Sequence, residues 1–311
     1  IYNSRPFINY SEFRYNSSYG INLYNDDYSA DSYLLVSHCD IHNNTVGIKA
    51  RGHDSDVFSH NTIYSNSPEG GIDADYGCTY SYNTVKNNTY SGSDSDVAGG
   101  MIVSSSNITL DHNTIINNSC SVGGVGSPNR VSDLFITNNG GNISDNFISN
   151  NTGGNEYAVR LGKQQGSFVN NIITDGQTYF DGNENYGNWT NNLFIGGLSG
   201  KIHFTGYNGG SAEFSNNTIL NSPGDDYEHK LTIGFMGDLN ETKYFSHNLF
   251  SKNSAGYYLQ CVAETYVSTT GNNFINNDDG FYVKAPDENS SVENNWWGTT
   301  TESGIQDLIY D

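Results

Sequence analysis

Two short segments of the chain place charged residues at every second position, between apolar ones. These segments read Gly47-Ile48-Lys49-Ala50-Arg51 and Gly71-Ile72-Asp73-Ala74-Asp75. Because side chains alternate across a β-strand, each segment would bury its Ile and Ala on one face and expose its charged residues on the other. We therefore expect Lys49, Arg51, Asp73 and Asp75 to share one outer surface.

Asp73 and Asp75 are candidate catalytic residues. Residues i and i+2 on one strand face lie roughly 6.5–7 Å apart at the Cα atoms. Their carboxyl groups can therefore reach the separation at which an inverting glycosidase uses one acid and one base. The same pair could instead hold Ca²⁺ in a polysaccharide lyase, where a cation neutralises a uronate and a Tyr, His or basic residue abstracts the C5 proton. A third alternative is that the two carboxylates only confer solubility.

Similar alternating segments farther along the chain add polar residues to the same face. His203 and Tyr258 are further candidates for catalysis, and His53 is a candidate acid or base nearby. The predicted substrate-binding residues are Lys49, Arg51, Arg160, Tyr282 and Lys284. Arg and Lys pair with carboxylate or sulfate, and Tyr offers a rigid amphipathic surface to a sugar ring. The face therefore predicts a groove for an acidic, hydroxylated polymer. The alternative is a solvated sheet face whose charges pair between strands, as Arg51 would with Asp75.

No metal ligand is assigned from the sequence. Segments 54–56 and 94–96 both read Asp-Ser-Asp, like parts of Ca²⁺-binding loops, but they lack the Gly and the distal Glu of an EF-hand. Ca²⁺ is the one cofactor that the carboxylates suggest, and the sequence requires none.

A six-residue phrase that occurs eleven times must position these residues. It starts at residues 36, 58, 80, 110, 143, 168, 189, 214, 245, 270 and 292. Its fourth residue is Asn in every copy except the first, where it is Cys39, and its sixth is always apolar. Steps of 21 to 33 residues between copies indicate stacked repeats. The units are rich in β-branched and aromatic residues and lack a helical stripe, so we predict an all-β, right-handed parallel β-helix of about eleven coils.

The recurring Asn predicts an internal ladder. Strands in successive coils lie ~4.8 Å apart, so an amide at the same turn of each coil can bond its neighbours. We expect the following residues to be buried and bonded in this way: Asn113, Asn146, Asn171, Asn192 and Asn217. We also expect these Asn residues to form the left-handed corner of the coil. His38, His60 and His112 precede ladder positions and are expected to be structural.

The repeat suggests a single domain with a cap at each end. We expect an N-terminal cap and first coil over residues 1–35, the β-helix over 36–297 and a C-terminal cap over 298–311. Loops around 89–97, 126–137 and 222–229 are expected to wall the groove, because insertions usually build the binding side of a solenoid. The spacing of the four Cys residues favours free thiols over disulfides.

Composition narrows the class of partner. The chain has 13 basic and 34 acidic residues and a net charge of −21, which disfavours nucleic acid and anionic membranes as partners. No apolar run approaches the roughly 18 residues of a membrane span, so we expect no membrane insertion. The chain begins at Ile1 without a signal-peptide pattern, and we interpret it as a mature or excised segment.

Three phrases carry a family resemblance: residues 58–63, 71–75 and 293–298. They resemble the parallel β-helix repeats of polysaccharide lyases and hydrolases and of large surface proteins of methanogenic archaea. Within that group the chain looks most like the disaggregatase-related proteins of Methanosarcina, which depolymerise the chondroitin-like matrix around cells. The resemblance spans residues 36–297 and implies a secreted or cell-surface enzyme that depolymerises an acidic, uronate-containing polysaccharide as a lyase or hydrolase. It carries over no catalytic residue, since no pectate-lyase or polygalacturonase signature is present, and a non-catalytic adhesin-like envelope protein is the alternative.

Overall fold

The computed structural model describes most of the chain. The described residues are 6–24, 33–92, 97–104, 107–120, 130–149, 157–164, 166–174, 178–185, 187–196, 198–206, 213–221, 231–237, 243–253, 257–261, 267–277, 281–284, 293–298, 303 and 309–310. The chain divides into two compact units, Ile1–Arg160 and Leu161–Asp311. Each unit is a right-handed parallel β-helix, as the sequence predicts.

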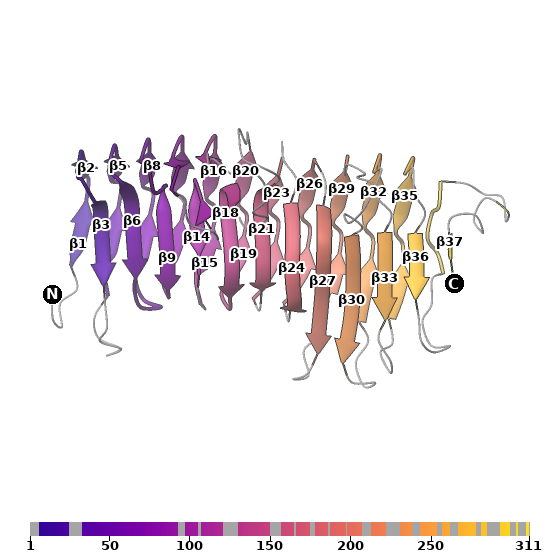
Figure 1. The fold of residues 1–311 in the computed structure, drawn as a ribbon. Coiled ribbons are helices and arrows are strands. Elements are labelled where there is room, and N and C mark those ends of the chain that lie inside the picture. Colours follow the sequence, from indigo (N-terminus) through magenta and orange to yellow (C-terminus); the bar gives the residue numbers. More distant parts are fainter. Residues whose placement is uncertain are drawn as a thin grey trace. The chain divides into compact units, whose positions relative to one another are not determined.

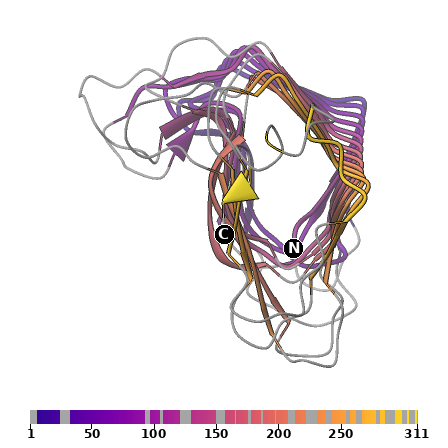
Figure 2. The same cartoon turned by 90° about the vertical axis from the view of Figure 1, so that its right-hand side faces the viewer.

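In the first unit, six coils each contribute strands to three parallel sheets (Figure 1). The first sheet contains β1 (Phe7–Asn9), β4 (Leu35–Ser37), β7 (Val57–Ser59), β10 (Thr79–Ser81), β15 (Thr109–Asp111) and β19 (Ile143–Ser144). The second sheet contains β2 (Glu12–Arg14), β5 (Asp40–His42), β8 (Thr62–Tyr64), β11 (Thr84–Lys86), β16 (Thr114–Ile116) and β20 (Phe147–Ser149). The third sheet contains β3 (Tyr19–Tyr24), β6 (Val46–Arg51), β9 (Ile72–Tyr76), β14 (Met101–Val103), β18 (Arg130–Asn139) and β21 (Tyr157–Gln164), whose first four residues lie in this unit. Seen along the stacking direction, these indigo to magenta strands overlay one another (Figure 2).

Three further short strands of this unit lie beside the coils. They are β12 (Thr89–Tyr90), β13 (Val97–Ala98) and β17 (Ser119–Cys120). Strand β12 pairs with β17 in a two-stranded sheet, and β13 pairs with β18 of the third sheet.

The second unit repeats the three-sheet arrangement over five coils. Its first sheet contains β22 (Phe168–Val169), β25 (Trp189–Thr190), β28 (Glu213–Ser215), β31 (Lys243–Ser246) and β34 (Val267–Thr270). Its second contains β23 (Ile172–Ile173), β26 (Leu193–Ile195), β29 (Thr218–Leu220), β32 (Leu249–Ser251) and β35 (Asn273–Ile275). Its third contains β24 (Thr178–Asn185), β27 (Leu198–Gly206), β30 (Leu231–Gly237), β33 (Tyr257–Cys261), β36 (Phe281–Lys284) and β37 (Ile309–Tyr310).

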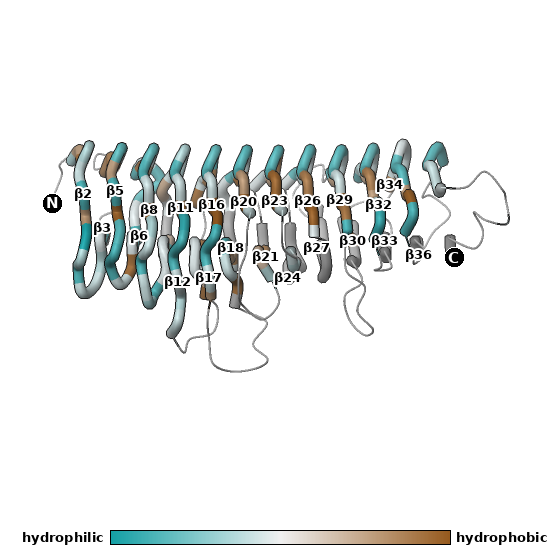
Figure 3. Tube along the Cα trace, turned by 90° about the horizontal axis from the view of Figure 1, so that it is seen from above, coloured by the Kyte–Doolittle hydropathy of each residue, from teal (hydrophilic) through white to brown (hydrophobic). Residues whose placement is uncertain are grey.

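Because side chains alternate between the two faces of a strand, each sheet has a column of apolar residues on the face that points into the coil. In the first unit the sixth residues of successive phrases are aligned and buried, for example Ile41, Ile63 and Val85. Aromatic rings stack in the same way, with 5.0 Å between the ring centroids of Phe58 and Tyr80. The hydropathy colouring changes between apolar and polar residues along strands such as β5 and β16 (Figure 3). A narrow core therefore needs only every second residue to be apolar.

The predicted Asn ladder is confirmed within each unit. In the first unit the Asn83 Oδ1 atom accepts hydrogen bonds from the backbone N–H of Asn61 at 3.0 Å and from its Nδ2 at 3.1 Å. The Asn83 Nδ2 atom donates to the Phe58 carbonyl at 2.8 Å and to the Asn113 Oδ1 at 3.0 Å. All five residues named in advance are buried, and all are bonded to neighbouring ladder residues. The ladder thus satisfies its amides without water.

The expectation that the ladder Asn itself forms the left-handed corner is wrong. The residue before it does so: the corner residues His38, His60, Tyr82, His112 and Asp145 have φ between 53° and 57°. The ladder Asn is instead held by the bonds of its backbone N–H and side chain, so the turn falls one residue earlier.

In the tenth copy, the ladder residue lies one position earlier than the six-residue phrase predicts. Phe245 is aligned with Thr269, and Asn248 bonds to the Oδ1 of Asn272, so the ladder residue is Asn272 and not Asn273. Gly271, with φ of 70°, forms the corner before it. Because this register aligns Phe250 with Phe274, it places the Phe274 ring in the core against Phe250.

A second ladder, which sequence reasoning missed, runs five residues after the first in the first unit. The side chains of Asn44, Asn66, Asn88 and Asn118 are buried and bonded in series through Nδ2 and Oδ1, at 3.1, 2.9 and 3.1 Å. This ladder lies against a Gly at or beside the start of β3, β6, β9 and β14. A Cβ on Gly47 would lie 2.9 Å from the Asn66 Nδ2, and equivalent contacts of 2.8–3.0 Å arise at three other strand starts, Gly20, Gly71 and Gly100. A backbone carbonyl oxygen of the next coil lies closer still, so a side chain at these positions would clash with both groups.

Asp133 is the last residue of this second ladder among the described residues of the first unit. It precedes Leu134, which is aligned with Met101, so it occupies the position that Gly100 has in the preceding coil. Its Oδ1 accepts a hydrogen bond of 2.9 Å from the Asn118 Nδ2. Its Oδ2 is buried and has no hydrogen-bond partner. Burial raises the pKa of Asp133 to about 8, although the hydrogen bonds from Asn118 oppose the shift. A neutral, protonated carboxyl therefore replaces the amide at neutral pH.

Three of the four Cys residues, Cys39, Cys78 and Cys120, are buried thiols, as expected, and the side chain of Cys261 lies outside the described residues. Within the part of the chain that the structure describes, no helix has the length and apolar character needed to cross a bilayer.

Substitution of a ladder residue tests this hydrogen-bonding scheme. We expect Asn83→Ala to lower the free energy of unfolding by about 3 kcal/mol or more, because the Asn61 amide groups and the Phe58 carbonyl each lose a partner. Thr84→Ala, on the outward side of β11, should change it by less than about 0.5 kcal/mol. Urea denaturation measures both, and an equal midpoint for Asn83→Ala and wild type would contradict the scheme.

Asp133→Asn tests the buried carboxyl. The pKa of Asp133 is higher in the folded protein than the ordinary 3.8, so its stabilising contribution is complete below about pH 4 and is lost as the pH rises toward 8. One such group lowers stability by at most about 1.4 kcal/mol per pH unit in this window. We expect Asp133→Asn to flatten this slope and to stabilise the protein more at pH 8 than at pH 5. The exposed Asp54→Asn variant is the control, and an unchanged slope in Asp133→Asn would refute the assignment.

Candidate functional site

The outer face of β3, β6 and β9 in the first unit carries the charged residues predicted from the sequence. Register pairs Lys49 with Asp73, while Ile48 and Ala50 on the same strand are fully buried. Lys49, Arg51, Asp73 and Asp75 therefore share one outer face, as the alternation predicts. We call these four residues, together with Tyr19 and Tyr24, the charged face.

The four charged residues form ion pairs between neighbouring coils. The Lys49 Nζ lies 2.9 Å from the Asp73 Oδ2, and the Arg51 Nε lies 3.8 Å from the Asp75 Oδ2. The hydrogen bond that Lys49 donates to Asp73 raises the pKa of Lys49, so this ammonium group stays charged over the physiological range. The register shifts between Ala50 and Arg51, which pairs with Tyr76 and not with Asp75. This shift accounts for the longer Arg51 contact.

Two tyrosine rings complete the charged face. The Lys49 Nζ lies 5.9 Å from the centroid of the Tyr19 ring, and the Arg51 Cζ lies 5.7 Å from that of Tyr24. These distances suit cation–π attraction, and the Tyr24 side chain is 64% exposed. Sequence reasoning missed both rings because it treated residues 1–35 as a cap. The alternation of Gly20, Ile21, Asn22 and Leu23 was the signal that could have identified this strand.

In the described residues of the first unit, apolar side chains cover the outer face of the third sheet around β14. Ile102 is aligned with Asp73 on one neighbouring strand and with Phe135 on the other. Apolar residues therefore continue the row of outward-facing side chains to which Asp73 belongs. Tyr90, Val97 and Cys120 pack against Ile102, and Phe135 is buried.

Only parts of the loops expected around 89–97 and 126–137 are described, since residues 93–96 and 126–129 lie outside the described residues. The described parts form β12, β13 and part of β18, and Tyr90 and Val97 are buried together with Cys120 against Ile102. The loop expected around 222–229 lies outside the described residues.

Arg160 lies on the covered part of the sheet. Its side chain is buried, and its Cζ lies 5.4 Å from the centroid of the Phe135 ring. This position differs from the expected exposed one, because Phe135 and Arg160 pack against each other on the outside of the coil. Arg160 is thus separate from the exposed cations Lys49 and Arg51.

The remaining predicted residues belong to the second unit. Tyr258 is aligned with Tyr282, and Gln260 with Lys284, across β33 and β36. His203 lies on β27 and is aligned with Gly234 of β30. The side chains of His203, Tyr258, Tyr282 and Lys284 lie outside the described residues. The candidate site is therefore built from the first unit alone.

The Asp-Ser-Asp segment at 54–56 has a structural role. Asp56 is buried, and its two carboxylate oxygens accept backbone hydrogen bonds from Leu34 at 2.6 Å and His53 at 2.7 Å. His53 in turn accepts a bond from the Ser55 N–H at its Nδ1. Asp56 therefore links the backbone of its own loop to that of the preceding coil. The segment at 94–96 lies outside the described residues.

The charged face can bind an anionic, hydroxylated ligand. The ion-paired side chains are 29–46% exposed, so a ligand carboxylate can compete with Asp73 and Asp75 for the two cations. Exposed ion pairs contribute only about 0–1 kcal/mol, and such an exchange therefore costs little. The neighbouring rings offer apolar surface at the same time.

Comparison with known proteins supports the fold at a coarse level. Residues 1–133 match the family model described as the right handed beta helix region. Neither curated proteins nor solved structures give a significant match to the chain. The first unit is thus similar to right-handed β-helices, a class that includes polysaccharide-active enzymes and adhesins.

Proposed function

We propose that the chain is a secreted or cell-surface protein that binds and depolymerises an acidic, uronate-containing polysaccharide on the charged face. This proposal rests on one observation: two cations, two carboxylates and two phenol rings lie together on the outer face of β3, β6 and β9. Two cations are set together here in a chain with a net charge of −21. Lys49 and Arg51 would bind the uronate carboxylates, and Tyr19 and Tyr24 would contact sugar rings.

The sequence resemblance suggests a chondroitin-like polymer as the substrate. The β-helix class supports a polysaccharide ligand in general, because both of its common roles involve glycans. The chondroitin-like matrix is the specific candidate that comes from the resemblance to the Methanosarcina disaggregatase-related proteins.

Asp73 and Asp75 are the residues that we propose for cleavage. As a hydrolase, one would protonate the leaving glycosidic oxygen while the other removes a proton from the attacking water. As a lyase, a base would take the C5 proton, the C4–O bond would break, and a proton would return to the leaving oxygen. Lys49 and Arg51 would stabilise the carboxylate charge that builds up in the second case. Ca²⁺ is the cofactor to test in that reaction.

A non-catalytic adhesin is the second candidate. The inter-coil ion pairs favour it, because each carboxylate of the charged face already contacts a cation of the neighbouring strand. Such a face binds a glycan without any acid–base step.

Binding should depend on the two cations and on salt. We expect Lys49→Ala and Arg51→Ala each to weaken binding to chondroitin about tenfold, since each removes a charge-assisted contact. Raising NaCl from about 0.1 M to about 1 M shortens the Debye length from roughly 10 Å to 3 Å and should also weaken binding. Calorimetric titration measures the affinity, with neutral dextran as the control polymer.

Lys86→Ala is the matched control variant. Lys86 lies on β11 of the second sheet with its Nζ 5.8 Å from the centroid of the Tyr64 ring, so it has a similar cation–ring contact on another face. Equal affinity of Lys49→Ala, Arg51→Ala and wild type would exclude the charged face as the binding surface.

Turnover should depend on the two carboxylates. We expect Asp73→Asn and Asp75→Asn to lower kcat by about 10²- to 10⁴-fold while binding is retained. Ultraviolet absorbance of an unsaturated product reports lyase chemistry and a reducing-end assay reports both reactions, each with and without chelator. Full activity of both variants would exclude the pair and direct attention to His203 and Tyr258. Binding without any turnover by wild type would establish the adhesin alternative.

A further inference from the structure

A column of rings runs along one corner of the first unit. The left-handed corner residues Tyr10, His38, His60, Tyr82 and His112 follow one another with 4.7–5.0 Å between ring centroids. This corner joins the first sheet to the second and lies apart from the charged face. The next coil places Asp145 at the same corner, with φ of 57°. The column of rings thus ends where a carboxylate follows His112.

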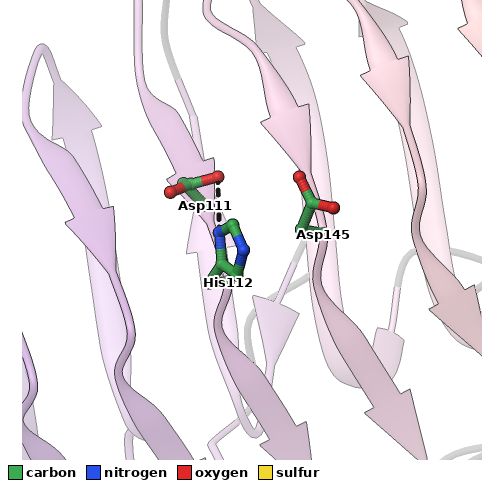
Figure 4. A group of neighbouring side chains, drawn as sticks. All are labelled: Asp111, His112 and Asp145. Carbon is green, nitrogen blue, oxygen red and sulfur yellow. Dashed lines mark ion pairs between the residues drawn. The ribbon is translucent and has the colours of Figure 1, made fainter.

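Three side chains meet at this point. Asp111 is the last residue of β15, His112 and Asp145 are successive corner residues, and one ligand atom from each lies within 4.8 Å of the other two. Figure 4 shows the Asp145 carboxylate facing the Asp111–His112 pair from the neighbouring coil. Among the described residues, this is the one group of three His, Cys, Asp or Glu side chains with such spacing.

We propose that Asp111, His112 and Asp145 bind a divalent transition-metal ion such as Zn²⁺. The Asp111 Oδ1 and His112 Nδ1 atoms are 2.9 Å apart. In the tetrahedral geometry that Zn²⁺ prefers, two ligands with bonds of roughly 2.1 Å lie about 3.4 Å apart. The 2.9 Å between the Asp111 and His112 atoms is close to this spacing. The Asp145 carboxylate lies within 4.8 Å of both atoms, so it must approach by at most about 1.4 Å, and rotation of its side chain brings it closer.

Neighbouring contacts hold these ligands in place. The His112 ring stacks on Tyr82 at 4.7 Å between centroids with an angle of 22° between the planes. Ser144, aligned with Asp111 on the next strand, donates from its Oγ to the Asp111 Oδ1 at 2.8 Å. Such outer contacts orient ligands in metal sites.

The donor set selects the class of ion. One imidazole with two carboxylates suits Zn²⁺ and similar transition metals, whereas Ca²⁺ takes six to eight oxygen ligands. Three protein ligands leave at least one position for water or another oxygen ligand. This site depends on none of the residues in the proposed glycan-binding face.

Calorimetric titration of the full chain with Zn²⁺, without an affinity tag, tests the site. We expect wild type to bind one Zn²⁺ ion there, and both His112→Asn and Asp145→Asn to weaken this binding at least tenfold. Asn suits both positions, because Asn170, Asn191 and Asn216 occupy the equivalent corner of the second unit with φ of 55–59°. Unfolding temperatures measured with and without Zn²⁺ provide a second readout, since an ion that binds the folded protein stabilises it.

His60→Asn is the matched control, because His60 is a corner residue of the same column two coils away. This variant should bind Zn²⁺ as wild type does, and any heat from Ca²⁺ should be the same in wild type, His112→Asn and Asp145→Asn. The proposal is wrong if wild type shows no Zn²⁺ binding or if His112→Asn and Asp145→Asn retain wild-type affinity. It is also wrong if His60→Asn abolishes binding, because the ion would then bind the adjacent His38 and His60 rings.

Discussion

The complete hydrogen bonding of a buried Asn side chain is the interaction on which the rest of this structure depends. The Asn83 amide accepts two bonds at Oδ1 and donates two from Nδ2, and every partner belongs to an adjacent coil. Each missing partner would cost about 1–3 kcal/mol, so a coil that slipped by one residue would lose several such bonds together. The ladder therefore sets the register, and the register aligns all other side chains in columns.

The second ladder shows how this constraint propagates into the backbone. In β3, β6, β9 and β14 the amide and a backbone carbonyl of the next coil fill the space that a side chain would need, so Gly stands at or beside the start of each strand. Asp133 occupies the equivalent position in β18. Its side chain lies next to Asn118 and accepts hydrogen bonds from the backbone N–H and the Nδ2 of that residue. This arrangement leaves one carboxyl oxygen buried without a partner, which raises the pKa of the group. Replacing a ladder amide with this carboxyl therefore makes stability depend on pH.

Features of the structure that repeat from coil to coil could be predicted from the sequence, whereas features that occur once could not. The phrase with Asn at its fourth position predicts the fold and the first ladder, and the period of two predicts that Lys49 and Asp73 share an outer face. The slip at Asn272 was not predictable from the phrase, because Asn272 and Asn273 are adjacent and only packing of Phe274 distinguishes them. The cover over Ile102 was missed for a related reason. Tyr90 and Val97 lie in an expected insertion, and their burial together with Cys120 is a tertiary effect.

Columns also explain where chemistry can arise in such a fold. A column of identical side chains, such as the ladder Asn, is structural because every member satisfies the next. A change of residue type along a column places unlike groups one strand spacing apart, about 4.8 Å. In the third sheet this change aligns Lys49 with Asp73, and at the corner it brings His112 against Asp145. The candidate sites therefore lie where the repeat departs from its own pattern, and the regular coils around them hold the departing residues at fixed spacing.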